Sequence, residues 1–218
     1  MNHLRTFLFL LFIYIMTVSC QSNAQTYTIE TNLGDIQVKL YEQTPLHKEN
    51  FEKLVTEQLY DSVLFHRIIP GFMIQTGNPA TKPGAEKDSL LISKYNYTVP
   101  AEFVPEYFHK KGALAAARTG DAVNPEKRSS STQFYIVQGR TFTDEELDQI
   151  EGNLHIQFSE SQRETYKTIG GTPFLDQNYT VFGEVVNGLD VVDAIASVPT
   201  GPGDFPVKDV RILRIIKD

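Results

Sequence analysis

The chain has almost no cysteine, since Cys20 is the only one in 218 residues. A single thiol cannot form an intrachain disulfide, so the fold must be held together by its core. Basic residues are also outnumbered, with 20 Lys and Arg against 27 Asp and Glu and a formal net charge of −7. This balance lacks the positive footprint that nucleic-acid binding requires, and we expect no nucleic-acid partner.

The sequence also lacks internal repeats, low-complexity stretches and an apolar run long enough to cross a bilayer. The apolar run Phe7–Val18 is short, because a spanning helix needs about 20 apolar residues. Arg5 precedes this run, and the pattern is typical of a secretory signal. We therefore predict a signal and short linker in residues 1–24 and one globular domain in residues 25–218, exported to the periplasm or cell envelope.

Two ways of processing this signal are compatible with the residues that follow it. Thr17–Cys20 resembles a lipoprotein box, in which Cys20 would carry lipid and attach the protein to a membrane. Ser22–Ala24 offers small residues for ordinary cleavage before Gln25. We favour lipidation of Cys20, because the position of the single cysteine at the end of the apolar run would otherwise be a coincidence.

Alternating apolar and polar residues mark the start of the folded part. Residues 27–31 and 36–41 alternate around the turn Asn32–Asp35, which predicts a β-hairpin. Thr44 followed by Pro45 predicts the start of a helix. Further strands are predicted at residues 63–76, 132–138, 181–186 and 210–216, and a second helix is predicted at residues 189–195. Many strands with two core helices indicate an antiparallel barrel with helical caps.

Residues 143–169 form a predicted α-helical insertion between two strands. Thr143 and Glu146 have the spacing of a capping box, and Phe142 and Leu147 have the spacing of the matching hydrophobic staple. The insertion either packs on the barrel as a surface addition or forms a rim that narrows access to a site.

The segment Phe65–Asn78, FHRIIPGFMIQTGN, resembles the signature of the cyclophilin family. Further matches lie at residues 50–51, 60–61, 112–118, 132–136, 174–176 and 181–185, so the resemblance covers most of the chain after the signal. It implies a mainly β fold, a closed eight-stranded antiparallel β-barrel capped by two α-helices. It also implies peptidyl-prolyl cis-trans isomerase activity without a cofactor on proline-containing polypeptide clients. We expect the protein to be a monomer.

This reaction makes modest chemical demands on a protein. Rotation about a peptide bond loses resonance and has a barrier of about 18–20 kcal/mol, but it breaks no covalent bond. An apolar pocket and a fixed cationic donor can stabilise the twisted amide more than either planar isomer. No nucleophile or metal is needed, and His66 in the signature has no second ligand at metal spacing.

The resemblance assigns roles to residues in and around the signature. Arg67 matches the catalytic arginine, Gln75 matches the glutamine expected to hold its guanidinium, and Phe72 matches a wall of the proline pocket; we predict these three as catalytic residues. The residues predicted to contact substrate are Met73, Ala117, Arg118, Gln133, Tyr135, Phe174, Leu175 and Tyr179.

Three of these positions depart from the family pattern. Tyr135 replaces a phenylalanine, and a hydroxyl in an apolar pocket needs a partner or water. Phe174 stands where eukaryotic members have a tryptophan that helps to bind cyclosporin, which predicts weak sensitivity to that drug. Tyr179 replaces a histidine at the rim.

Two other hypotheses compete with the enzyme. The chain could be a cyclophilin-like module or chaperone that binds proline-containing segments with little turnover. The intact set of Arg67, Phe72, Met73 and Gln75 favours the enzyme. A structural or sugar-binding β-domain of the cell envelope would leave the signature unexplained.

Overall fold

The structure is a computed structural model that describes residues 25–85 and 89–218. The predicted signal and the lipidation site Cys20 therefore lie outside the described residues. The strands are β1 Thr26–Thr31, β2 Gly34–Leu40, β3 Arg67–Ile69, β4 Met73–Thr76, β5 Thr98–Val99, β6 Ala113–Ala116, β7 Ser129–Ser130, β8 Phe134–Val137, β9 Val181–Asn187 and β10 Ile212–Lys217. The helices are α2 Pro45–Thr56, α3 Ser89–Lys94, α4 Asp144–Leu154, α5 Glu160–Thr168 and α6 Leu189–Ala196, with 3-10 turns η1 Pro79–Thr81, η2 Pro173–Leu175 and η3 Pro202–Asp204.

Eight strands form one antiparallel sheet in the order β10-β1-β2-β9-β6-β8-β4-β3, and β5 pairs with β7 in a separate ribbon. The predicted hairpin is confirmed: β1 and β2 pair with Ile29 opposite Ile36. Every second residue of both strands is buried, as expected for a sheet with one covered face.

The structure does not show the closed barrel that we expected. Strands β3 and β10 are the two edges of a half-barrel, and between them only one isolated bridge, Leu64 to Arg211, is formed within the described residues. The backbone N–H of Phe65 donates to Val210 beside this bridge. Ser62 has a φ of 66°, a left-handed conformation that interrupts an extended strand, so the pairing stops after a few residues.

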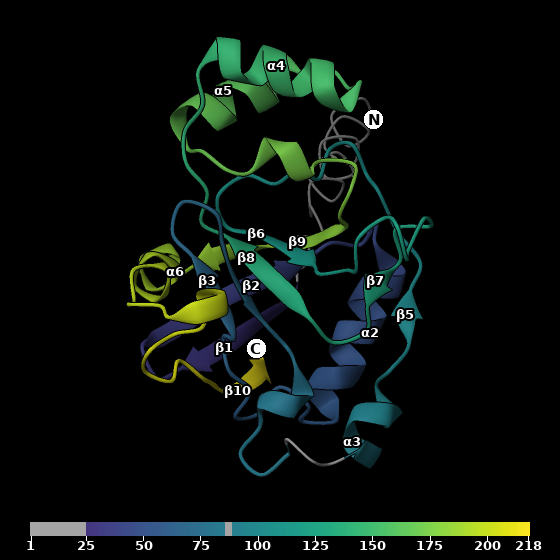
Figure 1. The fold of residues 1–218 in the computed structure, drawn as a ribbon, viewed down its shortest axis with the longest axis vertical. Helices are drawn as coiled ribbons and strands as arrows, with labels where there is room; N and C mark the ends of the chain where they lie inside the picture. The colour runs from purple at the N-terminus through teal and green to yellow at the C-terminus, as the bar shows by residue number, and fades with distance from the viewer. Residues whose placement is uncertain (1–24, 86–88) are drawn as a thin grey trace, which may run out of the picture.

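The two predicted core helices are α2 and α6, which lie on opposite sides of the curved sheet in Figure 1. Both contribute to the main core, α2 through Phe51 and α6 through Ile195. The predicted N-cap of α2, Thr44, makes no capping hydrogen bond with its side chain. The carboxylate of Glu102 instead accepts hydrogen bonds from the N–H groups of Leu46 and His47, which places a negative charge at the positive end of the helix.

The predicted insertion is confirmed as the helices α4 and α5, which lie apart from the sheet at the top of Figure 1. Both begin with a capping box, the first between Thr143 and Glu146 as predicted. The insertion has an apolar cluster of its own that includes Phe142, Leu147 and Tyr166. Among the described residues, no helix combines the length and apolarity that a membrane span requires.

Candidate active site

Strand register places the signature residues in one row across the sheet. Arg67 on β3 lies opposite Gln75 on β4, and Gln75 lies opposite Tyr135 on β8. Tyr135 in turn lies opposite Ala115 on β6. Because directly opposed residues share a face of the sheet, the arginine, the glutamine and the tyrosine project to the same side.

The two faces of these strands bury different clusters. Ile74, Leu114 and Ile136 point into the main core, whereas their neighbours Met73 and Tyr135 belong to a second apolar cluster on the other face. This division follows from the two-residue period of a strand. Partly buried Phe72, Leu175 and Tyr179 pack against the second cluster from neighbouring segments.

A small cavity of about 100 Å³ opens on this second face. It is here called the proline slot, after the pocket that the family resemblance predicts. Nine of the eleven predicted site residues line it: Arg67, Phe72, Met73, Gln75, Ala117, Arg118, Tyr135, Leu175 and Tyr179. The other two lie next to it. Gln133 accepts a hydrogen bond from the amide of Gln75 at 3.0 Å, and the ring of Phe174, 43% exposed, lies 5.7 Å from the ring of Phe72.

The guanidinium of Arg67 stands at the edge of the slot with 43% of its side chain exposed. Its Nε donates to Oδ2 of Asp204 at 3.3 Å. The family resemblance predicted that Gln75 holds this guanidinium, but the side-chain amide of Gln75 donates to Gln133 instead. Asp204 was not predicted, because it is 137 residues away from Arg67 in the sequence and no local pattern marks it.

Arg118 provides a second fixed cation at the rim. Its side chain is 4% exposed and donates from Nε to the carbonyl of Asn178 at 2.7 Å and from a terminal nitrogen to Asp121 at 2.6 Å. The guanidinium also lies 4.4 Å from the ring centre of Tyr179, which is cation–π geometry. Arg118 is therefore held in one conformation at the rim of the slot, so its side chain has little conformational entropy left to lose when a peptide binds.

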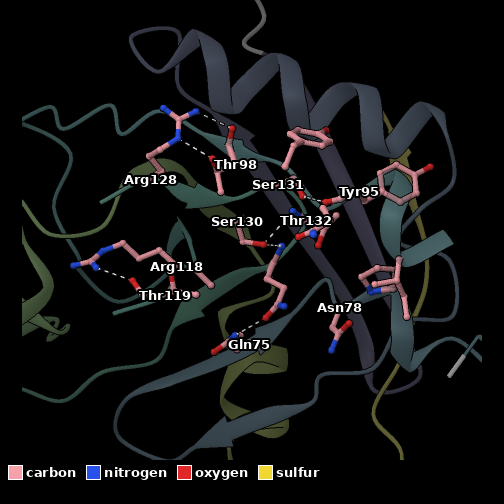
Figure 2. A pocket seen from close by; sticks show the side chains of 16 residues that line it. Gln75, Asn78, Tyr95, Thr98, Arg118, Thr119, Arg128, Ser130, Ser131 and Thr132 are labelled. Atoms are coloured by element: carbon pink, nitrogen blue, oxygen red, sulfur yellow. Dashed lines mark hydrogen bonds between the residues drawn. The ribbon is translucent and has the colours of Figure 1, made fainter. Parts of the chain in front are cut away.

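A larger cavity of about 340 Å³ continues from the slot. Figure 2 shows it lying between the Gln75 side and the segments around Tyr95 and Arg128. The two cavities share Gln75, Ala117 and Arg118. Together they form a groove, in which the slot has an apolar wall of Phe72, Met73 and Leu175 and the larger cavity continues toward Ser130 and Thr132. This shape suits an extended peptide with one apolar residue inserted.

The hydroxyl of Tyr135 has a partner that the sequence did not reveal. It lies 3.0 Å from Nε2 of His109, and both residues are buried. Burial, with smaller contributions from Tyr179 and Asp176, raises the pKa of Tyr135 well above its ordinary value. The phenol therefore stays neutral at physiological pH, and the slot carries no charge at its floor.

Comparison with known proteins agrees with this geometry. The family model described as cyclophilin type peptidyl-prolyl cis-trans isomerase matches residues 26–217. A relative from Staphylococcus saprophyticus, named as a peptidyl-prolyl cis-trans isomerase, is 36% identical over 84% of this chain and 87% of its own length. A similarly named relative from Staphylococcus haemolyticus is 35% identical over 88% of this chain and 90% of its own.

The same architecture occurs in a crystal structure of a cyclophilin type isomerase from Cryptosporidium parvum. That chain has a TM-score of 0.62 and 23% identity, and the match covers 89% of this chain and 97% of the other. At this identity the likeness shows the fold alone. Together with the family match and the bacterial relatives, it shows that the chain belongs to the cyclophilin-type peptidyl-prolyl cis-trans isomerases.

Proposed function

We propose that the proline slot is the active site, with Arg67, Phe72 and Gln75 as its catalytic residues. The observation that carries this proposal is the partly exposed guanidinium of Arg67, which lines the same small cavity as the apolar side chains of Phe72, Met73 and Leu175. A proline ring inserted among Phe72, Met73 and Leu175 would leave its preceding peptide bond at the edge of the slot. There the guanidinium of Arg67 can reach the polar atoms of the amide.

In this mechanism the protein stabilises the twisted amide and leaves the covalent bonds alone. As the amide leaves planarity, its nitrogen regains a lone pair, which a cationic N–H donor can stabilise. The interaction is stronger in the twisted state than in either planar isomer, so it lowers the barrier. Each 1.36 kcal/mol gained in this way accelerates the rotation about tenfold.

The residues before the proline would lie in the groove that runs past Gln133. The fixed side chains of Arg118 and Gln75 and the buried Ala117 form its walls. A second Cryptosporidium parvum structure, of 22% identity to this chain, was determined in the presence of the dipeptide Ala-Pro. It supports proline-containing peptides as the substrate class of this site.

The test is the isomerisation rate of a proline-containing peptide with wild-type protein and with Arg67→Ala. A hydrogen bond from a charged group contributes about 1.5–3 kcal/mol, so the variant should lose about 10- to 150-fold in kcat/KM. Arg214→Ala is the matched control, because Arg214 on β10 is an exposed arginine that pairs with Glu30 on β1. An Arg67→Ala variant with full activity would remove the assigned role, and wild type that binds peptide without accelerating isomerisation would identify a binding module.

We further propose that the protein acts as a monomer on proline-containing polypeptides outside the cytoplasm and is attached to a membrane through lipid on Cys20. The short apolar run and the position of the single cysteine support the export and the lipid anchor. Mass spectrometry of the mature N-terminus tests it: acyl groups on Cys20 are expected, and an unmodified N-terminus at Gln25 would refute the anchor. Size-exclusion chromatography of the mature protein tests the monomer.

A further inference from the structure

A chain of buried polar side chains runs from the helical insertion to the floor of the proline slot. Its members are Tyr166 on α5, Asp176 after η2, His109 before β6 and Tyr135 on β8. None is more than 4% exposed. Buried polar groups are expensive unless each has a hydrogen-bond partner, so a connected set of four is a built feature of the protein.

The distances show a continuous set of hydrogen bonds. The hydroxyl of Tyr166 donates to Oδ2 of Asp176 at 2.6 Å. The other carboxylate oxygen lies 2.7 Å from Nδ1 of His109 and accepts the backbone N–H of the same residue at 2.9 Å. At the far end, Nε2 of His109 lies 3.0 Å from the hydroxyl of Tyr135.

The donors and acceptors of this set balance in one arrangement. The His109 tautomer with its hydrogen on Nδ1 donates to the Asp176 carboxylate and leaves Nε2 as an acceptor. Tyr135 then donates its hydroxyl hydrogen to Nε2. Burial is the main cause that raises the pKa of both Tyr135 and Tyr166, so both phenols keep the hydrogen that this arrangement requires.

Close backbone packing joins the insertion to the same residues. A Cβ on Gly171 would lie 2.2 Å from the carbonyl oxygen of His109 and 2.7 Å from the ring of Tyr166, so only glycine fits there. The N–H of Thr172 donates to the carbonyl of His109 at 2.8 Å. The insertion is therefore attached directly to the histidine whose side chain contacts Tyr135.

We propose that the insertion positions the proline slot through this set of hydrogen bonds, with Tyr166, Asp176 and His109 as positioning residues for Tyr135. The proposal rests on the proposed function of the slot. The hydroxyl of Tyr135 is directed to His109, and its ring lies nearly parallel to the imidazole, with centres 6.0 Å apart and planes at 14°. Tyr166 is the link through which the insertion controls the shape of the slot.

The test is a double-mutant cycle in isomerisation kinetics, with Tyr166→Phe and Tyr135→Phe made singly and together. Tyr166→Phe removes one hydroxyl from a residue that does not line the slot. We expect it to lower kcat/KM about two- to tenfold, mainly through a higher KM, as loss of one hydrogen bond predicts. In the Tyr135→Phe background, where the chain of hydrogen bonds has no end, the same change should have no further effect.

The control is Phe158→Leu, which loosens the apolar cluster of the insertion beside Tyr166 but leaves the four hydrogen-bonded residues intact. It should lower the melting temperature without changing kcat/KM below that temperature. NMR of the His109 ring nitrogens gives a readout that does not depend on activity: their signals should shift in Tyr166→Phe and stay in place in Phe158→Leu.

Three results would overturn the proposal: unchanged kinetics in Tyr166→Phe, losses that multiply in the double variant, or unshifted His109 signals. A failure of the proposed function of the slot can be distinguished from these results, because Arg67→Ala would then retain full activity. If Arg67→Ala loses activity while the two tyrosines act independently, the active site stands and only the positioning role of the insertion is wrong.

Discussion

Replacing Asp204 by asparagine tests how the guanidinium of Arg67 is held. In the structure the carboxylate of Asp204 accepts a hydrogen bond from Nε of Arg67 at 3.3 Å. Asp204 has a φ of 62°, a left-handed conformation that asparagine also tolerates. The substitution therefore removes the charge while it keeps the shape of the loop and an oxygen that can accept a weaker hydrogen bond.

Two effects of the carboxylate oppose each other, and the exposure of the pair decides how large either can be. In the proposed mechanism, Asp204 favours catalysis by orienting the guanidinium and opposes it by partly neutralising the charge that would stabilise the twisted amide. The two side chains are 43% and 45% exposed, and pairs this exposed contribute about 0.2–1 kcal/mol. At 1.36 kcal/mol per tenfold change, Asp204→Asn should lower kcat/KM by about 1.4- to fivefold if orientation dominates.

The assay is peptide isomerisation at low and at high salt. The screening length falls from about 30 Å at 0.01 M to about 3 Å at 1 M ionic strength, so the difference between wild type and variant should narrow in 1 M salt. Asp209→Asn is the control, because Asp209 pairs with Arg211, an arginine that does not line the slot. A variant faster than wild type, or one more than tenfold slower, would refute the reasoning that orientation by an exposed pair sets the effect.

Two further predictions concern stability. Burial is the main cause that lowers the pKa of His47 and of His66 from the ordinary 6.5. As the pH falls, these histidines therefore take up protons in the unfolded chain before they do so in the folded protein. The free energy of unfolding should decrease as the pH drops below 6.5, by up to about 1.4 kcal/mol per pH unit for each histidine. Urea titrations between pH 7.5 and 5.5 measure this, and a flat profile would contradict it. Phe51→Ala should lower the free energy of unfolding by about 3–5 kcal/mol, because Phe51 is 2% exposed and its ring lies within 6 Å of four other aromatic rings. A loss below about 1 kcal/mol in urea titration would contradict this and show that the core closes around the cavity.

Features that depend on neighbouring residues could be predicted from the sequence. The β1–β2 hairpin, the helices α2 and α6 and the capping box at Thr143 all have short-range signals, and the structure contains each of them. The site residues were predicted through a resemblance that includes the signature and further matches along the chain. Register then explains why they meet: Arg67, Gln75 and Tyr135 lie opposite one another on adjacent strands.

Features that depend on contacts between distant segments could not be predicted in this way. The helix α2 is capped by Glu102, whose carboxylate arrives from 55 residues away, and the expected cap Thr44 has no such role. The extent of barrel closure depends on how far two edge segments pair, and the left-handed turn at Ser62 ends that pairing early.

By itself the sequence determined the family, the order of most strands and helices, and the residues that form the proline slot, because these follow from local periodicity and from a family resemblance that extends along most of the chain. Only the tertiary structure decided what surrounds the slot: the carboxylate that holds Arg67 and the buried chain that joins Tyr166 to Tyr135. The physical reason is that hydrogen bonds of 3 Å form between side chains that folding brings together, whatever their separation along the chain.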